Sequence, residues 1–336
     1  MKSLNNLKFP LIQGGMGVGI SLSHLAGEVA KCGCMGTISA ADIGFRKKDF
    51  FKNSKKNNYE ELKAEIERAK KISEGEGLVA INIMYASEDY EGLVKKSAEF
   101  GIDAIVSGAG LPLNLAELTK DYNLLIAPVV SGLRALKIIL KRWAKVNRLP
   151  DFIVIEGPLA GGHLGFKDPL NSESLLEITR EIKIYLDQNS LDIKIFSAGG
   201  IRTKKEFEDL KEMGAYGIQV ATPFIASYEC DGSDEFKNTI ISASDRDLEI
   251  INSPVGMPAR AVRNRFLNDI YKKKIRPRNF PCIKCIKTCD GKTMKYCITE
   301  YLIKSARGQS GLVFSGGKID GINKIRSVKE IIGDYF

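Results

Sequence analysis

Eight short apolar runs alternate along the chain with longer stretches of helical periodicity. Most runs are rich in Val and Ile and lack a polar residue at every second position. This pattern is typical of parallel strands that are buried on both faces of a sheet. The strands are therefore expected at residues 10–14, 35–39, 79–84, 104–108, 124–130, 152–157, 194–199 and 217–222.

The stretches between the runs carry apolar residues at helical spacing and recognisable start motifs. Ser21 is a candidate N-cap of the first helix, and Thr203 followed by Glu206 forms a capping-box pattern at the start of the last. The helices are expected at residues 21–31, 59–73, 89–100, 113–120, 133–146, 172–187 and 203–213.

Eight β/α units within about 230 residues predict an α/β fold of the (β/α)8 TIM-barrel type. A doubly wound open sheet is the alternative architecture. Residues 1–230 form the expected barrel, and residues 231–336 form a helical cap and a basic, Cys-rich C-terminal extension. Residues 233–307 predict helices without a clear strand, and residues 318–333 predict a last helix.

The loop at residues 41–58, after the second expected strand, is long and basic and carries Phe45, Phe50 and Phe51. Two interpretations fit this composition. The loop is either a lid over the site or a loosely packed insert.

The composition excludes several classes of protein. Of the 336 residues, 44% are hydrophobic and 27% are charged, which rules out disorder as the dominant state. No apolar run reaches the length of a membrane span, and the N-terminus shows no apolar core of a secretory signal. Seven cysteines without an export signal predict reduced thiols and a cytoplasmic protein.

The net charge of +9 is concentrated in one segment. Residues 258–307 hold fourteen Lys or Arg and three Asp or Glu. A positive segment favours an anionic partner, such as a phosphate-bearing cofactor or an acidic carrier protein, or else forms a solvated basic face. A nucleic-acid-binding module is disfavoured because no aromatic stacking pattern accompanies the basic residues.

Glycine recurs where the expected strands end. In a (β/α)8 barrel the active site lies at the C-terminal ends of the strands. Glycine at a strand end lets a backbone amide approach a ligand closely, and five of the eight ends have a glycine at the end or within two residues of it. Together they predict a large, flat, polar-edged cofactor. The candidates are residues 13–16, Asn82, 107–108, 128–131, Glu156 with Gly157, Ala198 with Gly199 and Gly200, and Ala221 with Thr222.

Two neighbouring strand ends fit a phosphate. Gly199 and Gly200 follow the seventh expected strand, and Ala221 and Thr222 follow the eighth. Loops at these positions of such barrels commonly bind phosphate through backbone N–H groups, although Gly-Gly also suits a tight turn. Residues 15–19 are not a dinucleotide-binding fingerprint, because their glycines have G-x-G-x-G spacing and no acid ends the second strand.

His163 is the candidate catalytic residue. It stands in a glycine-rich segment after the sixth expected strand, flanked by Gly161 and Gly162, and an imidazole that titrates near neutral pH can take or give a proton during turnover. The other histidine, His24, lies on the first expected helix and is interpreted as a packing or surface residue.

In their order, these motifs resemble the nitronate monooxygenase (formerly 2-nitropropane dioxygenase) family, which includes enoyl-ACP reductase II and consists of FMN-dependent (β/α)8 barrels. The resemblance covers about residues 7–230 and, less closely, the tail. Its carriers are residues 13–16, Asn82 in 80–83, residues 160–163, residues 197–201 and residues 219–222.

The resemblance implies FMN as cofactor and a role for each matched residue. His163 would face the substrate beside the reactive flavin N5, and the flavin would accept the electrons. The implied cofactor-binding residues are Gly14, Gly15 and Met16 along the flavin ring, Asn82 at its polar edge, Gly161 and Gly162 close to the cofactor, Gly199, Gly200, Ala221 and Thr222 at the phosphate, and Glu156, Ala198 and Gln219 beside them.

The implied activity is oxidation of alkyl nitronates with dioxygen to a carbonyl compound and nitrite. The alternative is an NAD(P)H-dependent enoyl-ACP reductase or a general NAD(P)H-dependent flavin or quinone reductase. Acyl carrier protein is the implied partner of the enoyl-ACP reductase. Enoyl-ACP reductase II usually has Glu two residues before the Gly-Gly pair, where this chain has Leu159. A homodimer is the expected assembly, without nucleic-acid or membrane partners.

Four cysteines of the basic segment form a separate motif. Cys282, Cys285, Cys289 and Cys297 lie within sixteen residues, close enough to bind Zn or an iron–sulfur cluster. Their spacing matches neither the common zinc pattern nor the common iron–sulfur pattern well. Reduced structural thiols and a redox disulfide therefore remain as alternatives.

Overall fold

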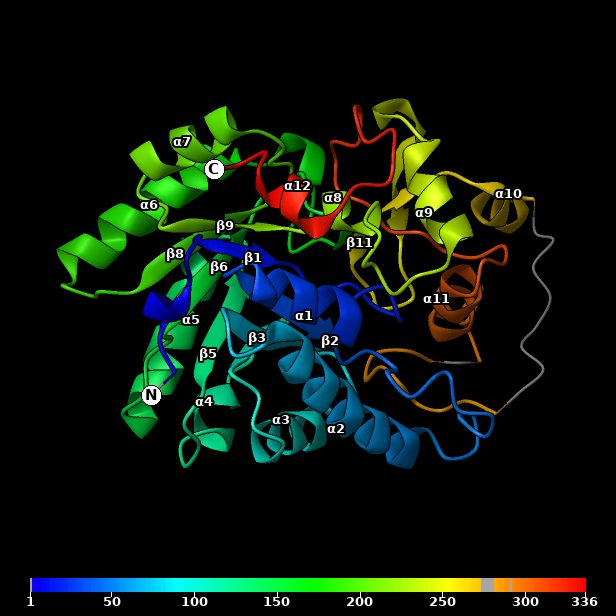
Figure 1. The fold of residues 1–336 in the computed structure, drawn as a ribbon, viewed down its shortest axis with the longest axis horizontal. Coiled ribbons are helices and arrows are strands. Elements are labelled where there is room, and N and C mark those ends of the chain that lie inside the picture. Colours follow the sequence, from blue (N-terminus) through cyan, green and yellow to red (C-terminus); the bar gives the residue numbers. More distant parts are fainter. Residues whose placement is uncertain (1, 273–280, 291) are drawn as a thin grey trace.

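The computed structural model describes residues 2–272, 281–290 and 292–336. Its centre is a closed barrel of eight parallel strands, which β1 and β9 close by pairing Ile12 with Gln219 (Figure 1). Each predicted run overlaps one of these strands, so the TIM-barrel prediction is confirmed and the open sheet is wrong. The barrel strands are β1 (Leu11–Gln13), β2 (Met35–Ser39), β3 (Leu78–Met84), β4 (Ala104–Gly108), β5 (Leu125–Val130), β6 (Phe152–Glu156), β8 (Lys194–Ala198) and β9 (Gly217–Val220).

Both faces of the strands are buried, which explains why the runs are continuously apolar. Side chains such as Ile12, Val106 and Phe196 fill the barrel interior, while Ile81 and Ile153 pack outward against the surrounding helices. These helices are α1 (Ser23–Lys31), α2 (Ser54–Ser73), α3 (Tyr90–Glu99), α4 (Leu115–Leu118), α5 (Leu133–Trp143), α6 (Leu175–Gln188), α7 (Lys204–Glu212) and α8 (Thr222–Ile225).

Helix starts follow the predicted caps only where the cap is local. The Thr203 hydroxyl accepts the backbone N–H of Glu206 and completes the predicted capping box of α7. In contrast, α2 begins at Ser54, whereas the prediction placed its start at residue 59. The prediction missed the first turn because its sequence, Ser-Lys-Lys-Asn-Asn, has no apolar residue to mark it.

Residues 231–336, named here the extension, contain strands that the sequence analysis missed. Strand β11 pairs antiparallel with β10 and with β7 (Gly162–His163), which lies in the β6–β8 connection of the barrel. The expectation of helices alone over 233–307 is therefore wrong. Ile250 and Ile251 stand side by side in β10, so its apolar residues do not alternate. The extension elements are α9 (Asp234–Ile241), β10 (Leu248–Asn252), β11 (Pro258–Val262), α10 (Arg265–Tyr271), α11 (Ile298–Ala306) and α12 (Val328–Ile332).

The extension is joined to the barrel by shared apolar contacts. Helices α9 to α11 gather at one end of the barrel, while α12, shorter than the predicted 318–333, packs beside α1 (Figure 1). Phe45 and Phe50, from the loop after β2, are 3% and 1% exposed and belong to one apolar cluster with Phe236 and Ile303 of the extension. This loop is therefore not a loosely packed insert.

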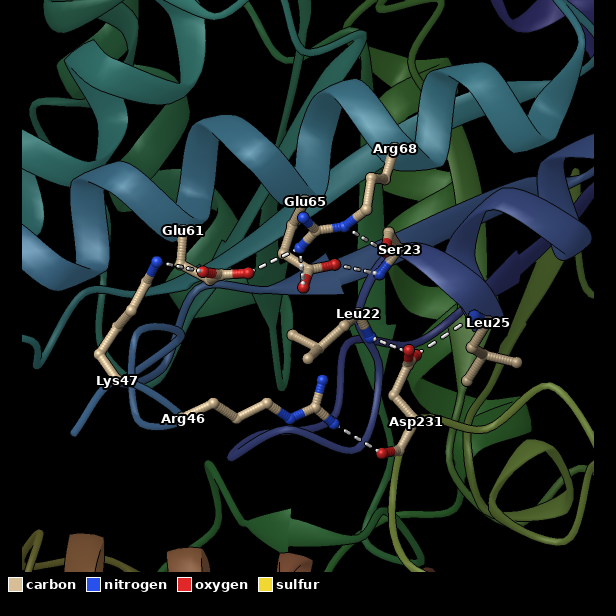
Figure 2. A network of polar contacts seen from close by, with 9 residues as sticks. All are labelled: Leu22, Ser23, Leu25, Arg46, Lys47, Glu61, Glu65, Arg68 and Asp231. Atoms are coloured by element: carbon tan, nitrogen blue, oxygen red, sulfur yellow. Dashed lines mark hydrogen bonds and ion pairs between the residues drawn. The ribbon is translucent and has the colours of Figure 1, made fainter. Parts of the chain in front are cut away.

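The N-terminus of α1 is capped by a residue more than two hundred positions away. Ser21 is not its N-cap; Leu22 holds that position and offers no side-chain cap. Instead, the Asp231 carboxylate accepts the backbone N–H groups of Leu22, at 2.7 Å, and Leu25, at 3.2 Å (Figure 2). A carboxylate at this position also complements the positive end of the helix dipole.

A second carboxylate extends this capping network into α2. The Glu65 side chain accepts the backbone N–H of Ser23 at 2.7 Å and is paired with Arg68 at 2.6 Å (Figure 2). Arg46, from the loop after β2, donates to the Asp231 carbonyl at 2.9 Å. The network therefore joins α1, α2, this loop and the first residue of the extension.

Replacing Asp231 by Ala is expected to lower the free energy of unfolding by about 1–2 kcal/mol, because two helix N–H groups lose their acceptor. Asp231→Asn keeps a carbonyl oxygen and should lose less, and Glu208→Ala, at an exposed position of α7, should leave stability unchanged. Urea unfolding followed by circular dichroism measures all three. Equal losses for Asp231→Asn and Asp231→Ala would contradict the capping role.

Candidate active site

One cavity lies at the C-terminal ends of the barrel strands, and the extension forms its opposite wall. The structure brings the predicted catalytic residue and all the implied cofactor-binding residues into the lining of this cavity. These residues are His163, Gly14, Gly15, Met16, Asn82, Glu156, Gly161, Gly162, Ala198, Gly199, Gly200, Gln219, Ala221 and Thr222. Other strand-end candidates do not line the cavity, namely Gln13, Ser107, Pro128, Val130, Ser131 and Gly157.

Several of the glycines that line the cavity stand where no side chain fits. A Cβ atom on Gly15 would lie 2.4 Å from Cβ of Asn82, and one on Gly161 would lie 2.6 Å from the backbone carbon of Ser315. Gly199 and Gly200 have φ values of +108° and +79°, which L side chains rarely adopt.

Glycines at several strand ends leave backbone without side chains in the cavity lining, and Gly199 and Gly200 turn the chain at the end beside the start of α7. Such a cradle fits a planar ring with a phosphate at the α7 end, because backbone N–H groups and a helix N-terminus favour an anion. The residues present therefore fit FMN.

His163 lies in a strand and not in a loop as predicted. It pairs with Ala259 of β11, its Nε2 atom is 2.7 Å from Oγ of Ser253, and its ring meets Phe314 edge-on at 5.2 Å between centroids. Burial lowers the pKa of His163 to about 4. The expected titration near neutral pH is therefore wrong. At pH 7 the imidazole is neutral, which is the form that can accept a proton.

Two carboxyl groups also line the cavity. Burial raises the pKa of Glu156 to about 8, so this side chain is mainly protonated at pH 7. Asp42 accepts a hydrogen bond from Oγ1 of Thr299 at 2.7 Å, and burial raises its pKa to about 6. The sequence analysis missed Asp42, although this residue stands three positions after the C-terminal end of β2, at the edge where the site was expected.

The extension supplies an apolar wall that the sequence analysis did not assign to the site. Ile298 and Leu302 lie four positions apart on α11, which is the only local sign that they share a face. Among the described residues, the apolar lining from the extension consists of Phe236, Val255, Ile286, Ile298, Leu302, Leu312 and Phe314.

The predicted metal site is not formed. Within residues 2–272, 281–290 and 292–336, no group of three or more His, Cys, Asp or Glu side chains is placed to hold a metal ion. Cys282 is exposed, whereas burial raises the pKa of the Cys285 thiol to about 12. Residues 273–280 of the basic segment lie outside the described residues.

A (β/α)8 barrel with a cavity at the C-terminal ends of its strands has the site geometry of the TIM-barrel enzymes. The chain belongs to the nitronate monooxygenase family, whose family model matches residues 1–335. The protein is therefore an oxidoreductase, and FMN is the cofactor consistent with its family.

Individual relatives agree with this assignment. A probable nitronate monooxygenase of Staphylococcus saprophyticus is 25% identical over 290 residues, which are 79% of this chain and 78% of the relative. FabK from Thermotoga maritima superposes with a TM-score of 0.73 at 23% identity, covering 99% of this chain and 93% of that structure. Nitroalkane oxidase from Streptomyces ansochromogenes superposes at 0.70 with 15% identity, covering 98% and 96%. These two structures show the shared fold.

No helix in the part of the chain that the structure describes is both long and apolar enough to cross a membrane.

Proposed function

We propose that this enzyme is a nitronate monooxygenase that uses FMN and dioxygen to convert alkyl nitronates to a carbonyl compound and nitrite. The observation that carries the proposal is the neutral, buried imidazole of His163 in the wall of the glycine-lined cavity. The family membership and the probable nitronate monooxygenase of S. saprophyticus support it.

When bound, FMN supplies the electron acceptor, and the residues of the chain bind it and manage protons. Gly14, Gly15 and Met16 would contact its ring, and Gly199 and Gly200 would present backbone amides to its phosphate.

The base in this reaction is His163, which accepts the α-proton of a neutral nitroalkane and thereby forms the nitronate. Its Nε2 contact with Ser253 holds the ring in place. A protonated Glu156 adds no negative charge to the cavity, so it does not repel the anionic nitronate. The apolar wall of the extension contacts the alkyl group and excludes water.

A reductase is the second candidate. The apolar wall fits an acyl chain, and the basic excess over residues 258–307 fits an acyl carrier protein or a pyridine nucleotide. In that function NADH or NADPH, instead of the nitronate, reduces the flavin.

Anaerobic reduction separates the two functions. The FMN-loaded protein is mixed without oxygen with ethyl nitronate, NADH or NADPH, and the visible flavin absorbance is followed. Bleaching by the nitronate alone, followed by nitrite release when oxygen is admitted, is the expected result. Rapid bleaching by NADH or NADPH with no response to the nitronate would replace the proposal by the reductase.

The low pKa of His163 predicts a flat pH profile for neutral nitroethane. A base is active when unprotonated, so kcat/KM should stay level from pH 8 down to about pH 5 and should fall as the pH drops through the pKa of about 4. An exposed histidine would lose activity below pH 6.5. Stopped-flow assays with freshly dissolved nitroethane measure the profile in the wild type and in Asp42→Asn, because Asp42 lines the same cavity with a pKa of about 6. A decline centred near pH 6.5 in both proteins would contradict a buried base.

A further inference from the structure

The end of the cavity at α7 carries a positive charge that no side chain of the described residues neutralises. Arg202 and Lys318 both line this end, next to Gly200 and Gly316. Lys318 forms an ion pair with Glu206, whereas no ion pair joins Arg202 to a carboxylate anywhere in residues 2–272, 281–290 and 292–336.

Glu206 contacts the backbone of Arg202 but forms no ion pair with its guanidinium, because its oxygens are directed to other donors. Its Oε2 atom accepts the backbone N–H of Arg202 at 2.7 Å and that of Thr203 at 3.0 Å, and its Oε1 atom receives Lys318. These bonds fix the start of α7 and leave the guanidinium of Arg202 without a counter-ion.

The guanidinium of Arg202 also holds an unsatisfied donor. Its Nε atom is buried and has no hydrogen-bond partner within the described residues, and its Nη1 atom makes only a long contact of 3.4 Å with the Lys318 carbonyl. Because this guanidinium has no counter-ion among the described residues and belongs to a residue that lines the cavity, it is available to an anionic ligand.

The surroundings of Arg202 select the chemistry of this ligand. Gly199 and Gly200 turn the chain immediately before it with positive φ values, and the Thr222 hydroxyl accepts the backbone N–H of Gly316 at 2.9 Å, which brings the β9–α8 turn to the same end. Exposed amides, a helix N-terminus and a planar cation together suit a phosphate monoester, which a guanidinium binds through paired N–H···O bonds.

We propose that Arg202 binds the phosphate of FMN by direct charge-assisted hydrogen bonds and is the residue by which the protein distinguishes FMN from riboflavin. This inference rests on the proposed FMN cofactor and adds a side chain to a phosphate site that the sequence analysis built from backbone amides alone. Arg202 is a cofactor-binding residue here and takes no part in proton transfer.

Flavin titration tests the assignment. Apoprotein is titrated with FMN and with riboflavin, and flavin fluorescence reports binding. In Arg202→Gln the Kd for FMN should rise at least tenfold, and the Kd for riboflavin, which has no phosphate, should stay within twofold of the wild-type value. Arg202→Lys, which keeps the charge but not the paired donors, should lie between. Lys205→Gln removes an equal charge from the exposed side of α7, which begins two residues after Arg202, and should change neither Kd.

Several results would overturn the assignment. Equal weakening of FMN and riboflavin in Arg202→Gln would make Arg202 a structural residue, as would a lowered melting temperature that explains the loss. Equal affinity of the wild type for FMN and riboflavin would overturn the role of Arg202 but keep the flavin. An unchanged Kd for FMN in Arg202→Gln would leave the phosphate to the backbone amides alone. Failure of the wild type to bind either flavin would overturn the proposed cofactor as well.

Discussion

His163→Asn is expected to lower kcat/KM for neutral nitroalkanes by about 10²–10⁴-fold, because a positioned general base contributes that much to proton transfer. The neutral imidazole lines the cavity and is held by Ser253, so its removal leaves no equivalent base at that point of the wall. Initial rates of oxygen consumption with freshly dissolved nitroethane measure the loss.

Preformed ethyl nitronate serves as the internal control for this substitution. Its α-proton is already gone, so its rate should fall much less than that of nitroethane. His24→Asn alters an exposed histidine of α1 and should leave both rates unchanged. Full activity of His163→Asn on neutral nitroethane would contradict the assigned role. Loss of FMN from this variant would instead place His163 in the cofactor site.

Gly200→Val is expected to raise the Kd for FMN at least tenfold. A Cβ atom at this position would lie 2.8 Å from Cβ of Leu159, and the backbone φ of +79° is unfavourable for an L residue by about 1–2 kcal/mol. The turn between β8 and α7 must therefore shift, and its amides leave the cavity end where the phosphate is expected. Fluorescence titration of the apoprotein with FMN measures the change.

Gly75→Val is the matched control for Gly200→Val, because it introduces a similar backbone strain at a position outside the FMN site. Gly75 has a φ of +85° with no atom within 4 Å of the added Cβ, and it follows α2, outside the lining of the cavity. This variant should lose stability to a similar extent and bind FMN with wild-type affinity. If Gly200→Val also keeps wild-type affinity, the β8–α7 turn does not contact the phosphate.

Features that depend on neighbours in the chain were predictable from the chain. The eight apolar runs predict the barrel because both faces of each strand are buried, and this requirement is written locally in every run. The capping box of Thr203 and Glu206 involves residues three apart and was predicted correctly. Closure of the barrel then brings all eight strand ends to one rim, so the residues after the runs identify the lining of the cavity.

Features that depend on contacts between distant segments came only from the tertiary structure. The cap of α1 is one case. The prediction of Ser21 as its N-cap is wrong, because Asp231, the first residue of the extension, accepts the N–H groups at the start of this helix. The missed strands β10 and β11 are another, because they depend on pairing with each other and with β7 rather than on a local pattern of their own.

The chemistry of the site shows the same division. The residues around His163 mark it as a base, but its low pKa arises from burial beneath the extension, and burial likewise protonates Glu156. The four cysteines are close in the chain, yet the fold does not place them as a metal site within the described residues. Glu206 pairs with Lys318, more than a hundred positions away, and the Nε atom of Arg202 has no partner among the described residues. Desolvation and the choice of partner depend on what the folded chain packs around a group, which its neighbours in the sequence do not specify.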